Sequence, residues 1–244
     1  MVAGPSLDAD SGTHSFAAER AACGEGSGEP TISPMILTMD RERLWEIVER
    51  ARAGAGAGAG ETVTAEAAEA VARQLVSQLT ALGPAAAVEF QLAYDALNQE
   101  AYRWNLWAAA YLLRGGCSDD GFDYFCGWLV AQGRSVWEQA VADPDSLADA
   151  GVDPDDDMVE CEDVLAAALN AYAEATGDEE AFWEALDAAR HDRPEADFTG
   201  PAGDDFDFDD DEQMRAHLPR LAAIYRPTKR VQPPRHSGQT PQPS

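Results

Sequence analysis

Six residues between positions 103 and 123 have side chains that could hold or transform a ligand. They are Arg103, Trp107, Arg114, Asp119, Asp120 and Asp123. An arginine can hold an anionic group with two parallel hydrogen bonds, an aspartate can ligate a metal ion or act as a general base, and an indole ring can stack on a flat group. Together these side chains would suit an enzyme or a protein that binds a small anion or a metal ion.

The spacing of these residues predicts that they can approach one another. At about 100° per residue, the two arginines and the tryptophan share the side of a predicted helix that apolar residues leave free. On the next predicted helix, Asp119 and Asp123 share a narrow strip and the third aspartate flanks it. Gly115-Gly116 lies between the two helices and lets the chain reverse tightly. The two strips could therefore face each other across the turn.

A purely structural interpretation accounts for the same residues. Ser118 is a favoured helix N-cap, and Asp119 and Asp120 would follow it in the first turn, where the helix dipole stabilises acids. Asp123 could form an ion pair with either arginine and close the turn. Both interpretations remain open from the sequence.

Other chemistry-bearing residues do not form a recognisable motif. The cysteines are Cys23, Cys117, Cys126 and Cys161. They lack C-x-x-C spacing and a neighbouring histidine, so a zinc site, a disulfide framework or an activated thiol is not expected. The acidic runs at 153–164 and 205–216 lack the glycine and glutamate of a calcium-binding loop at the sixth and twelfth positions. We expect no metal site and no cofactor.

Apolar residues recur at steps of three and four through most of the chain, which predicts helices. The expected ranges are about 40–52, 64–82, 84–114, 118–132, 134–142, 158–176, 178–190 and 210–225. The third is expected to be one long central helix, because it is apolar on two sides. Pro219 should kink or split the last. No run of alternating apolar and polar residues indicates a β-strand. The predicted fold is therefore all-α, a single compact multi-helix domain with disordered N- and C-terminal tails.

Composition divides the chain into three parts. Residues 1–38 are predicted to be a disordered N-terminal extension, residues 39–225 the helical domain, and residues 226–244 a Pro-rich, basic, disordered tail. The GAGAGAG tract at 54–60 is typical of a flexible linker within the domain.

The charge balance restricts the class of partner. The chain has 45 acidic and 17 basic residues, for a net charge of −28. Such a chain repels phosphate backbones and anionic lipids, so nucleic-acid and membrane binding are not expected. No apolar run is long enough for a bilayer span and no signal-peptide pattern is present, so we expect a cytoplasmic protein. A protein partner with a basic surface would fit this charge.

The segment GGCSDDGFDYF, at 115–125, resembles the uncharacterised bacterial domain of unknown function 4240 (DUF4240) family. The likeness extends over 98–148, with DRERLWEIVERA at 40–51 and HLPRLAAIY at 217–225. The resemblance implies a small helical bacterial domain that spans about 39–225. It also implies an arginine after the DYF motif, where this chain has Cys126.

Two functions are therefore compared. The first is a non-enzymatic protein-binding or regulatory module that presents an acidic surface to a basic partner. The alternative is an enzyme, or a small-anion or metal-binding protein, that uses the Arg/Asp strip at 103–123. The net charge and the lack of a catalytic constellation favour the first.

Overall fold

Helices build most of the described chain, which confirms the predicted all-α class. The computed structural model describes residues 39–58, 62–152, 159–191 and 200–226. Its elements are α1 (Arg41–Gly54), α2 (Ala65–Leu82), α3 (Pro84–Ala101), α4 (Trp104–Arg114), α5 (Asp119–Ala131), α6 (Arg134–Ala142), the 3-10 helix η1 (Pro144–Asp149), α7 (Glu162–Leu165), α8 (Ala167–Thr176), α9 (Glu180–His191), α10 (Asp211–His217) and α11 (Pro219–Tyr225). The N-terminal extension and the tail after Arg226 lie outside these ranges.

Three helices begin where a capping side chain predicts. Asp40 accepts a hydrogen bond from the backbone N–H of Arg43 at 2.8 Å, and Thr64 accepts one from Ala67 at 3.3 Å. Ser118 accepts one from Gly121 at 3.2 Å. Each bond satisfies a backbone donor that the first helical turn leaves unpaired.

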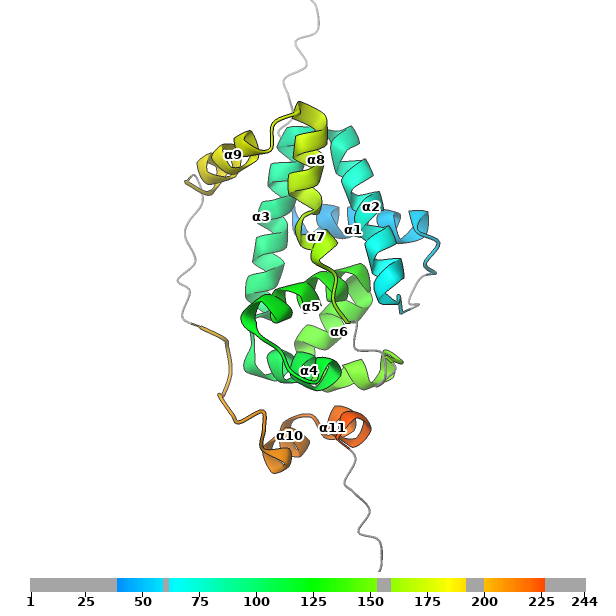
Figure 1. Ribbon diagram of the computed structural model, residues 1–244, viewed down its shortest axis with the longest axis vertical. Coiled ribbons are helices and arrows are strands. Elements are labelled where there is room, and N and C mark those ends of the chain that lie inside the picture. Colours follow the sequence, from blue (N-terminus) through cyan, green and yellow to red (C-terminus); the bar gives the residue numbers. More distant parts are fainter. Residues whose placement is uncertain (1–38, 59–61, 153–158, 192–199, 227–244) are drawn as a thin grey trace, which may run out of the picture. The chain divides into compact units, whose positions relative to one another are not determined.

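The prediction of one long helix over 84–114 is wrong, because the helix is interrupted at Tyr102 and Arg103. There the backbone N–H of Trp104 donates to the carbonyl of Ala202 at 3.0 Å, and the N–H of Ala202 donates to the carbonyl of Tyr102 at 2.9 Å. These bonds form a single parallel bridge between Arg103 and Ala202. They replace helical hydrogen bonds with bonds to a residue far along the chain, so α4 runs crosswise to α3 (Figure 1).

Two other predicted helices are also divided. The predicted helix over 158–176 forms α7 and α8, which meet at Ala166. Residues 159–161 are not helical, and residue 158 lies outside the described ranges. The last helix is split into α10 and α11 at Leu218, immediately before Pro219, which confirms the predicted effect of that proline. The carboxylate of Asp145 accepts from the backbone N–H groups of Arg220 and Leu221 at 2.9–3.1 Å, and so caps α11 from η1.

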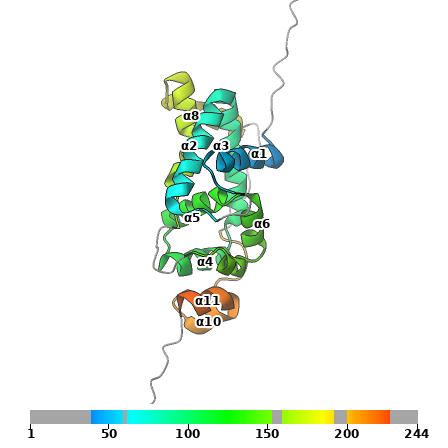
Figure 2. The same cartoon turned by 90° about the vertical axis from the view of Figure 1, so that its right-hand side faces the viewer.

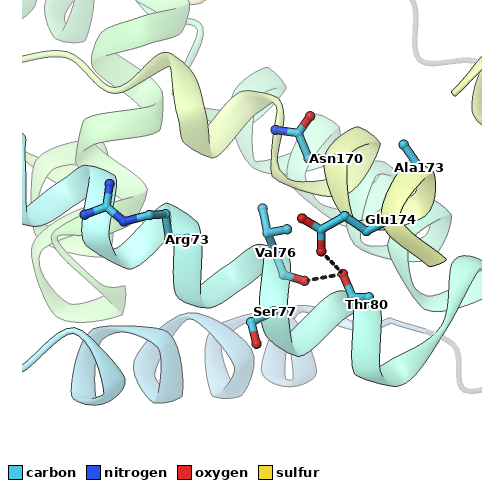
Figure 3. Close-up of a pocket in the computed structure, with 7 residues that line it drawn as sticks. All are labelled: Arg73, Val76, Ser77, Thr80, Asn170, Ala173 and Glu174. Atoms are coloured by element: carbon cyan, nitrogen blue, oxygen red, sulfur yellow. Dashed lines mark hydrogen bonds between the residues drawn. The ribbon is translucent and has the colours of Figure 1, made fainter. Parts of the chain in front are cut away.

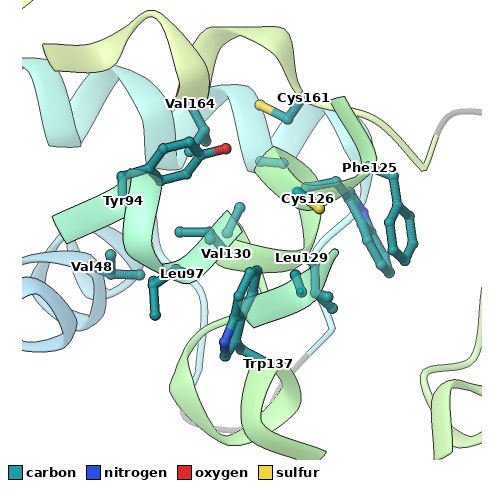
Figure 4. Close-up of a cluster of buried hydrophobic side chains, with 14 of the residues drawn as sticks. Val48, Tyr94, Leu97, Phe125, Cys126, Leu129, Val130, Trp137, Cys161 and Val164 are labelled. Atoms are coloured by element: carbon teal, nitrogen blue, oxygen red, sulfur yellow. The ribbon is translucent and has the colours of Figure 1, made fainter. Parts of the chain in front are cut away.

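The core is organised around α5. Helices α2, α3 and α8 pack against one another, α1 packs on α2, and α5 contacts α2, α6 and α7 (Figures 1 and 2). Side chains from α1, α3, α6 and α7 meet those of α5 in a buried cluster (Figure 4). Helix α11 contacts α4 and η1. None of the helices in the described ranges combines the length and the apolarity that a bilayer crossing requires.

The backbone at Cys161 packs directly on α5. Its N–H donates to the carbonyl of Tyr124 at 2.9 Å. A Cβ atom at Gly127 would lie 2.3 Å from the Cys161 carbonyl oxygen, closer than any van der Waals contact allows. Glycine is therefore required at this position for α5 and the segment before α7 to meet.

Two buried polar side chains hold the chain on both sides of the Gly/Ala tract. Arg52 donates to the carbonyl of Ala131, and to that of Gly58 at 3.2 Å. Gln132 accepts from the N–H of Val63 at 2.8 Å and donates to the carbonyl of the same residue at 3.1 Å. Residues 59 and 60 of the predicted linker lie outside the described residues, and α1 continues to Gly54.

Candidate functional site at the turn between α4 and α5

The six candidate residues lie on α4, on α5 and in the break before α4. Arg103 precedes α4 and Arg114 ends it, so at 1.5 Å per residue their Cα atoms are roughly 16 Å apart. The exposed Arg103 turns back and donates from Nε to the carbonyl of Glu100 at 2.8 Å. In this conformation the two guanidinium groups are bound to different partners, so they do not clamp one small anion.

Arg114 is held by groups of the chain itself. One guanidinium nitrogen donates to the carbonyl of Gly121, and another lies 2.5 Å from the carboxylate of Glu160. The side chain of Arg114 is only 16% exposed, so this ion pair is partly shielded from water. A Cβ atom at Gly121 would lie 2.7 Å from this guanidinium, so a larger residue there would require the Arg114 side chain to shift.

Asp119, Asp120 and Asp123 form an exposed group that we call the acidic strip. Within the described ranges, none of the three forms an ion pair with a basic residue. Desolvation, followed by the nearby Asp120 and Asp119, raises the pKa of Asp123. The strip is therefore a concentration of negative charge that the surrounding part of the protein does not neutralise.

Tyr102 adjoins the acidic strip and was not among the predicted residues. Burial, followed by the charges of Asp119 and Asp123, raises the pKa of its hydroxyl. Its ring lies 5.4 Å from that of Trp107 and 5.9 Å from that of Phe122. An aromatic surface thus borders the carboxylates.

Trp107 takes part in the packing of this aromatic surface. Its ring stacks on Phe122 at 5.1 Å and 22° and on Trp104 at 6.1 Å and 20°. Its Nε1–H points to the carbonyl of Cys117 at 3.3 Å. The indole is half-buried, and its aromatic neighbours already occupy much of the stacking surface that was considered for a ligand.

The thiol of Cys117 is not poised for nucleophilic chemistry. Burial raises its pKa to about 11, although Arg114 acts in the opposite direction.

In the described part of the chain, no three His, Cys, Asp or Glu residues are grouped so that they could hold a metal ion.

A family model described as a protein of unknown function, DUF4240, matches residues 39–174. The chain belongs to the DUF4240 family. The match covers more than half of the 244 residues, and it includes the acidic strip and the aromatic surface beside it. The chain has no match among curated proteins or among solved structures.

In this DUF4240 chain, the position where the resemblance implies an arginine belongs to the core. Cys126 is 1% exposed, and burial raises its pKa well above the usual value for a thiol. Helices α9, α10 and α11 lie beyond the matched residues, so the proposed extent of 39–225 for the domain stays a prediction.

The DUF4240 chain also has a surface hollow of about 650 Å³ between α2 and α8. Its lining is Arg73, Val76, Ser77, Thr80, Asn170, Ala173 and Glu174 (Figure 3). The hydroxyl of Thr80 lies 2.8 Å from the carbonyl of Val76 and 3.1 Å from the carboxylate of Glu174. None of the six predicted residues lines this hollow.

Sequence reasoning missed Glu160 and Tyr102 for different reasons. Glu160 is 46 positions from Arg114, and no local pattern joins an acid to a base at that separation. Tyr102 falls inside the continuous helix predicted over 84–114, whereas in the structure it lies at the break before α4, beside the acidic strip.

Proposed function

We propose that this DUF4240 chain is a non-enzymatic binding module that receives a basic segment of a protein partner on its acidic strip. The observation that carries the proposal is the state of Asp119, Asp120 and Asp123: they are exposed at the head of α5 without a basic partner among the described residues. A guanidinium or ammonium group can pair with such carboxylates.

The contacts and positions of the nearby arginines favour this proposal over the alternative of a small-anion site. Arg114 already has an anionic partner in Glu160, and Arg103 lies at the opposite end of α4. An anion bound at the turn would have to displace Glu160 and approach three carboxylates. A cation approaching the same turn meets an attractive field.

The net charge of −28 should extend this attraction beyond contact distance. The proposed partner is therefore a protein with a basic surface, and neither nucleic acid nor membrane lipid. A bacterial, cytoplasmic setting is part of the proposal and is what the family resemblance implies.

The test measures binding of a fluorescent arginine-rich peptide to the full chain by anisotropy at several salt concentrations. The wild type should bind, and its affinity should fall as salt rises, because screening weakens exposed charge pairs. The triple variant Asp119→Asn, Asp120→Asn, Asp123→Asn should bind at least about tenfold more weakly, a change of about 1.4 kcal/mol.

A matched control removes the same charge from scattered positions. Glu66→Gln, Glu179→Gln and Glu212→Gln change three exposed acids on or beside different helices. This control should retain most of the binding. Equal loss in the two triple variants would show that only the overall charge matters and would overturn the assignment to the acidic strip.

A further inference from the structure

A second pocket lies beside the acidic strip, between α3, α5, α7, α8 and α9. It has a volume of about 230 Å³. The apolar part of its lining is Leu165, Ala166, Leu169, Phe182, Trp183 and Leu186. We call it the α9 pocket. Complete small-molecule sites usually measure about 300–1,000 Å³, so this pocket is of a size for one side chain of a larger ligand.

Trp183 gives the α9 pocket an exposed aromatic wall. It is 51% exposed, whereas the adjoining Phe182 is 1% exposed and contacts it edge to face at 5.2 Å. Tryptophan is enriched among the residues that contribute most to the binding energy of protein interfaces. The buried phenylalanine fixes one side of the indole, so the wall is prepared for contact.

The charged groups at the rim leave the pocket with a negative edge. Arg190 lies 2.8 Å from Asp95 and 3.9 Å from Asp187, so its charge is offset. Glu162 also lines the pocket, is exposed, and has no ion-pair partner in the part of the chain that the structure describes. A ligand side chain flanked by cations would be favoured at this edge.

Helix α5 joins the rim to the acidic strip. Tyr124 lines the pocket, and Asp120 lies four residues before it, so their side chains are neighbours on one helix face. The charge of Glu162, followed by desolvation and then by the charge of Asp120, raises the pKa of Tyr124. The Tyr124 hydroxyl therefore lies close enough to feel the charges of both Glu162 at the rim and Asp120 in the acidic strip.

We infer that the α9 pocket receives a large apolar side chain of the same basic segment that binds the acidic strip. This inference rests on the proposed function and specifies the partner: an amphipathic, arginine- or lysine-rich segment with one aromatic or branched aliphatic anchor. The strip attracts the cations, and the pocket selects among basic segments by the anchor.

Two synthetic arginine-rich peptides of equal length and charge test the inference, one with phenylalanine and one with alanine at the anchor position. The wild-type chain should bind the phenylalanine peptide about tenfold more tightly, which corresponds to about 1.4 kcal/mol. Trp183→Glu should abolish this preference and still bind both peptides. Leu82→Glu is the control, because Leu82 is similarly exposed at 43% and lines neither pocket.

The triple Asp→Asn variant separates the two proposals. This variant should bind both peptides more weakly than the wild type does, and it should still bind the phenylalanine peptide more tightly than the alanine peptide. If neither peptide binds the wild type, the proposed function fails; if both bind equally, only the anchor inference is overturned.

Two further outcomes would replace the partner with another occupant. A tenfold gain in peptide affinity on deletion of residues 227–244 would show that the chain's own basic tail fills the site. A dimer in sedimentation that Trp183→Glu dissociates would show a second copy there. Unchanged affinity and an unchanged monomeric mass would support a separate protein partner.

Discussion

The carboxylate of Glu160 lies 2.5 Å from the guanidinium of Arg114 and joins the segment before α7 to the end of α4. This ion pair has a consequence for charge as well as for stability. It supplies Arg114 with an acid from outside the turn, and the three aspartates of the acidic strip are left exposed beside it. The proposed binding of cations to this surface depends on this pairing.

Replacing Glu160 with glutamine should lower the free energy of unfolding by about 1 kcal/mol, because a partly buried, charge-assisted hydrogen bond is lost. Urea denaturation with circular dichroism measures the change. Glu179→Gln, at an exposed position, should alter stability by much less. Equal stabilities for the wild type and Glu160→Gln would mean that the pair does not hold the turn.

Gly127→Ala should destabilise the fold although alanine favours helices more than glycine does. The new Cβ atom would lie 2.3 Å from the Cys161 carbonyl oxygen, and a backbone atom cannot move aside cheaply. We expect a loss of about 2 kcal/mol or more in thermal or urea unfolding.

Gly54→Ala is the matched control for that substitution. The atom in the way there is the end of the Gln74 side chain, which can rotate. Its stability should equal or exceed that of the wild type. If both variants lose the same stability, the close approach of α5 to Cys161 is not the cause.

Gln132→Leu should destabilise the domain by about 2 kcal/mol, because the buried backbone N–H and carbonyl of Val63 would lose their partner. Gln139→Leu, at an exposed position of α6, should be close to neutral. Hydrogen exchange measured by mass spectrometry should also show faster exchange around Val63 in Gln132→Leu alone. Unchanged exchange there would contradict the role of Gln132.

Asp123 should make the stability of the domain depend on pH in a defined direction. Its pKa is raised in the folded chain, so the folded state holds its proton more tightly than the unfolded state. Its contribution is greatest below the ordinary aspartate pKa and is lost as pH rises through the raised value. Asp123→Asn should therefore be slightly more stable than the wild type at pH 7.

Urea denaturation between pH 3 and pH 7 checks this sign. The difference between Asp123→Asn and the wild type should shrink toward zero at the acidic end of that range. A variant that is less stable than the wild type at pH 7 would show that the charged Asp123 has a favourable partner in the fold.

Local signals predicted most helix boundaries, and contacts between distant residues produced the exceptions. The caps at Asp40, Thr64 and Ser118 are readable because each bond joins residues three positions apart. The break at Arg103 depends on Ala202, and no breaker residue marks it in the sequence. Propensity and periodicity cannot register such a bridge.

Only the part of the candidate site that depends on local signals could be predicted from the sequence. The position of the three aspartates at the head of α5 follows from the Ser118 cap and from helical spacing. The partner of Arg114 and the neighbourhood of Tyr102 depend on tertiary packing. Whether the six predicted residues bind a ligand remains a prediction.

The most direct test of the central claim locates a bound basic peptide on the chain. Backbone amide chemical shifts of isotope-labelled protein should be recorded during titration with the arginine-rich peptide, at low and at high salt. We predict that shifts concentrate in residues 118–124 at low salt and diminish when salt screens the charges. Shifts that spread evenly over exposed acids, or that centre on α2 and α10, would contradict it.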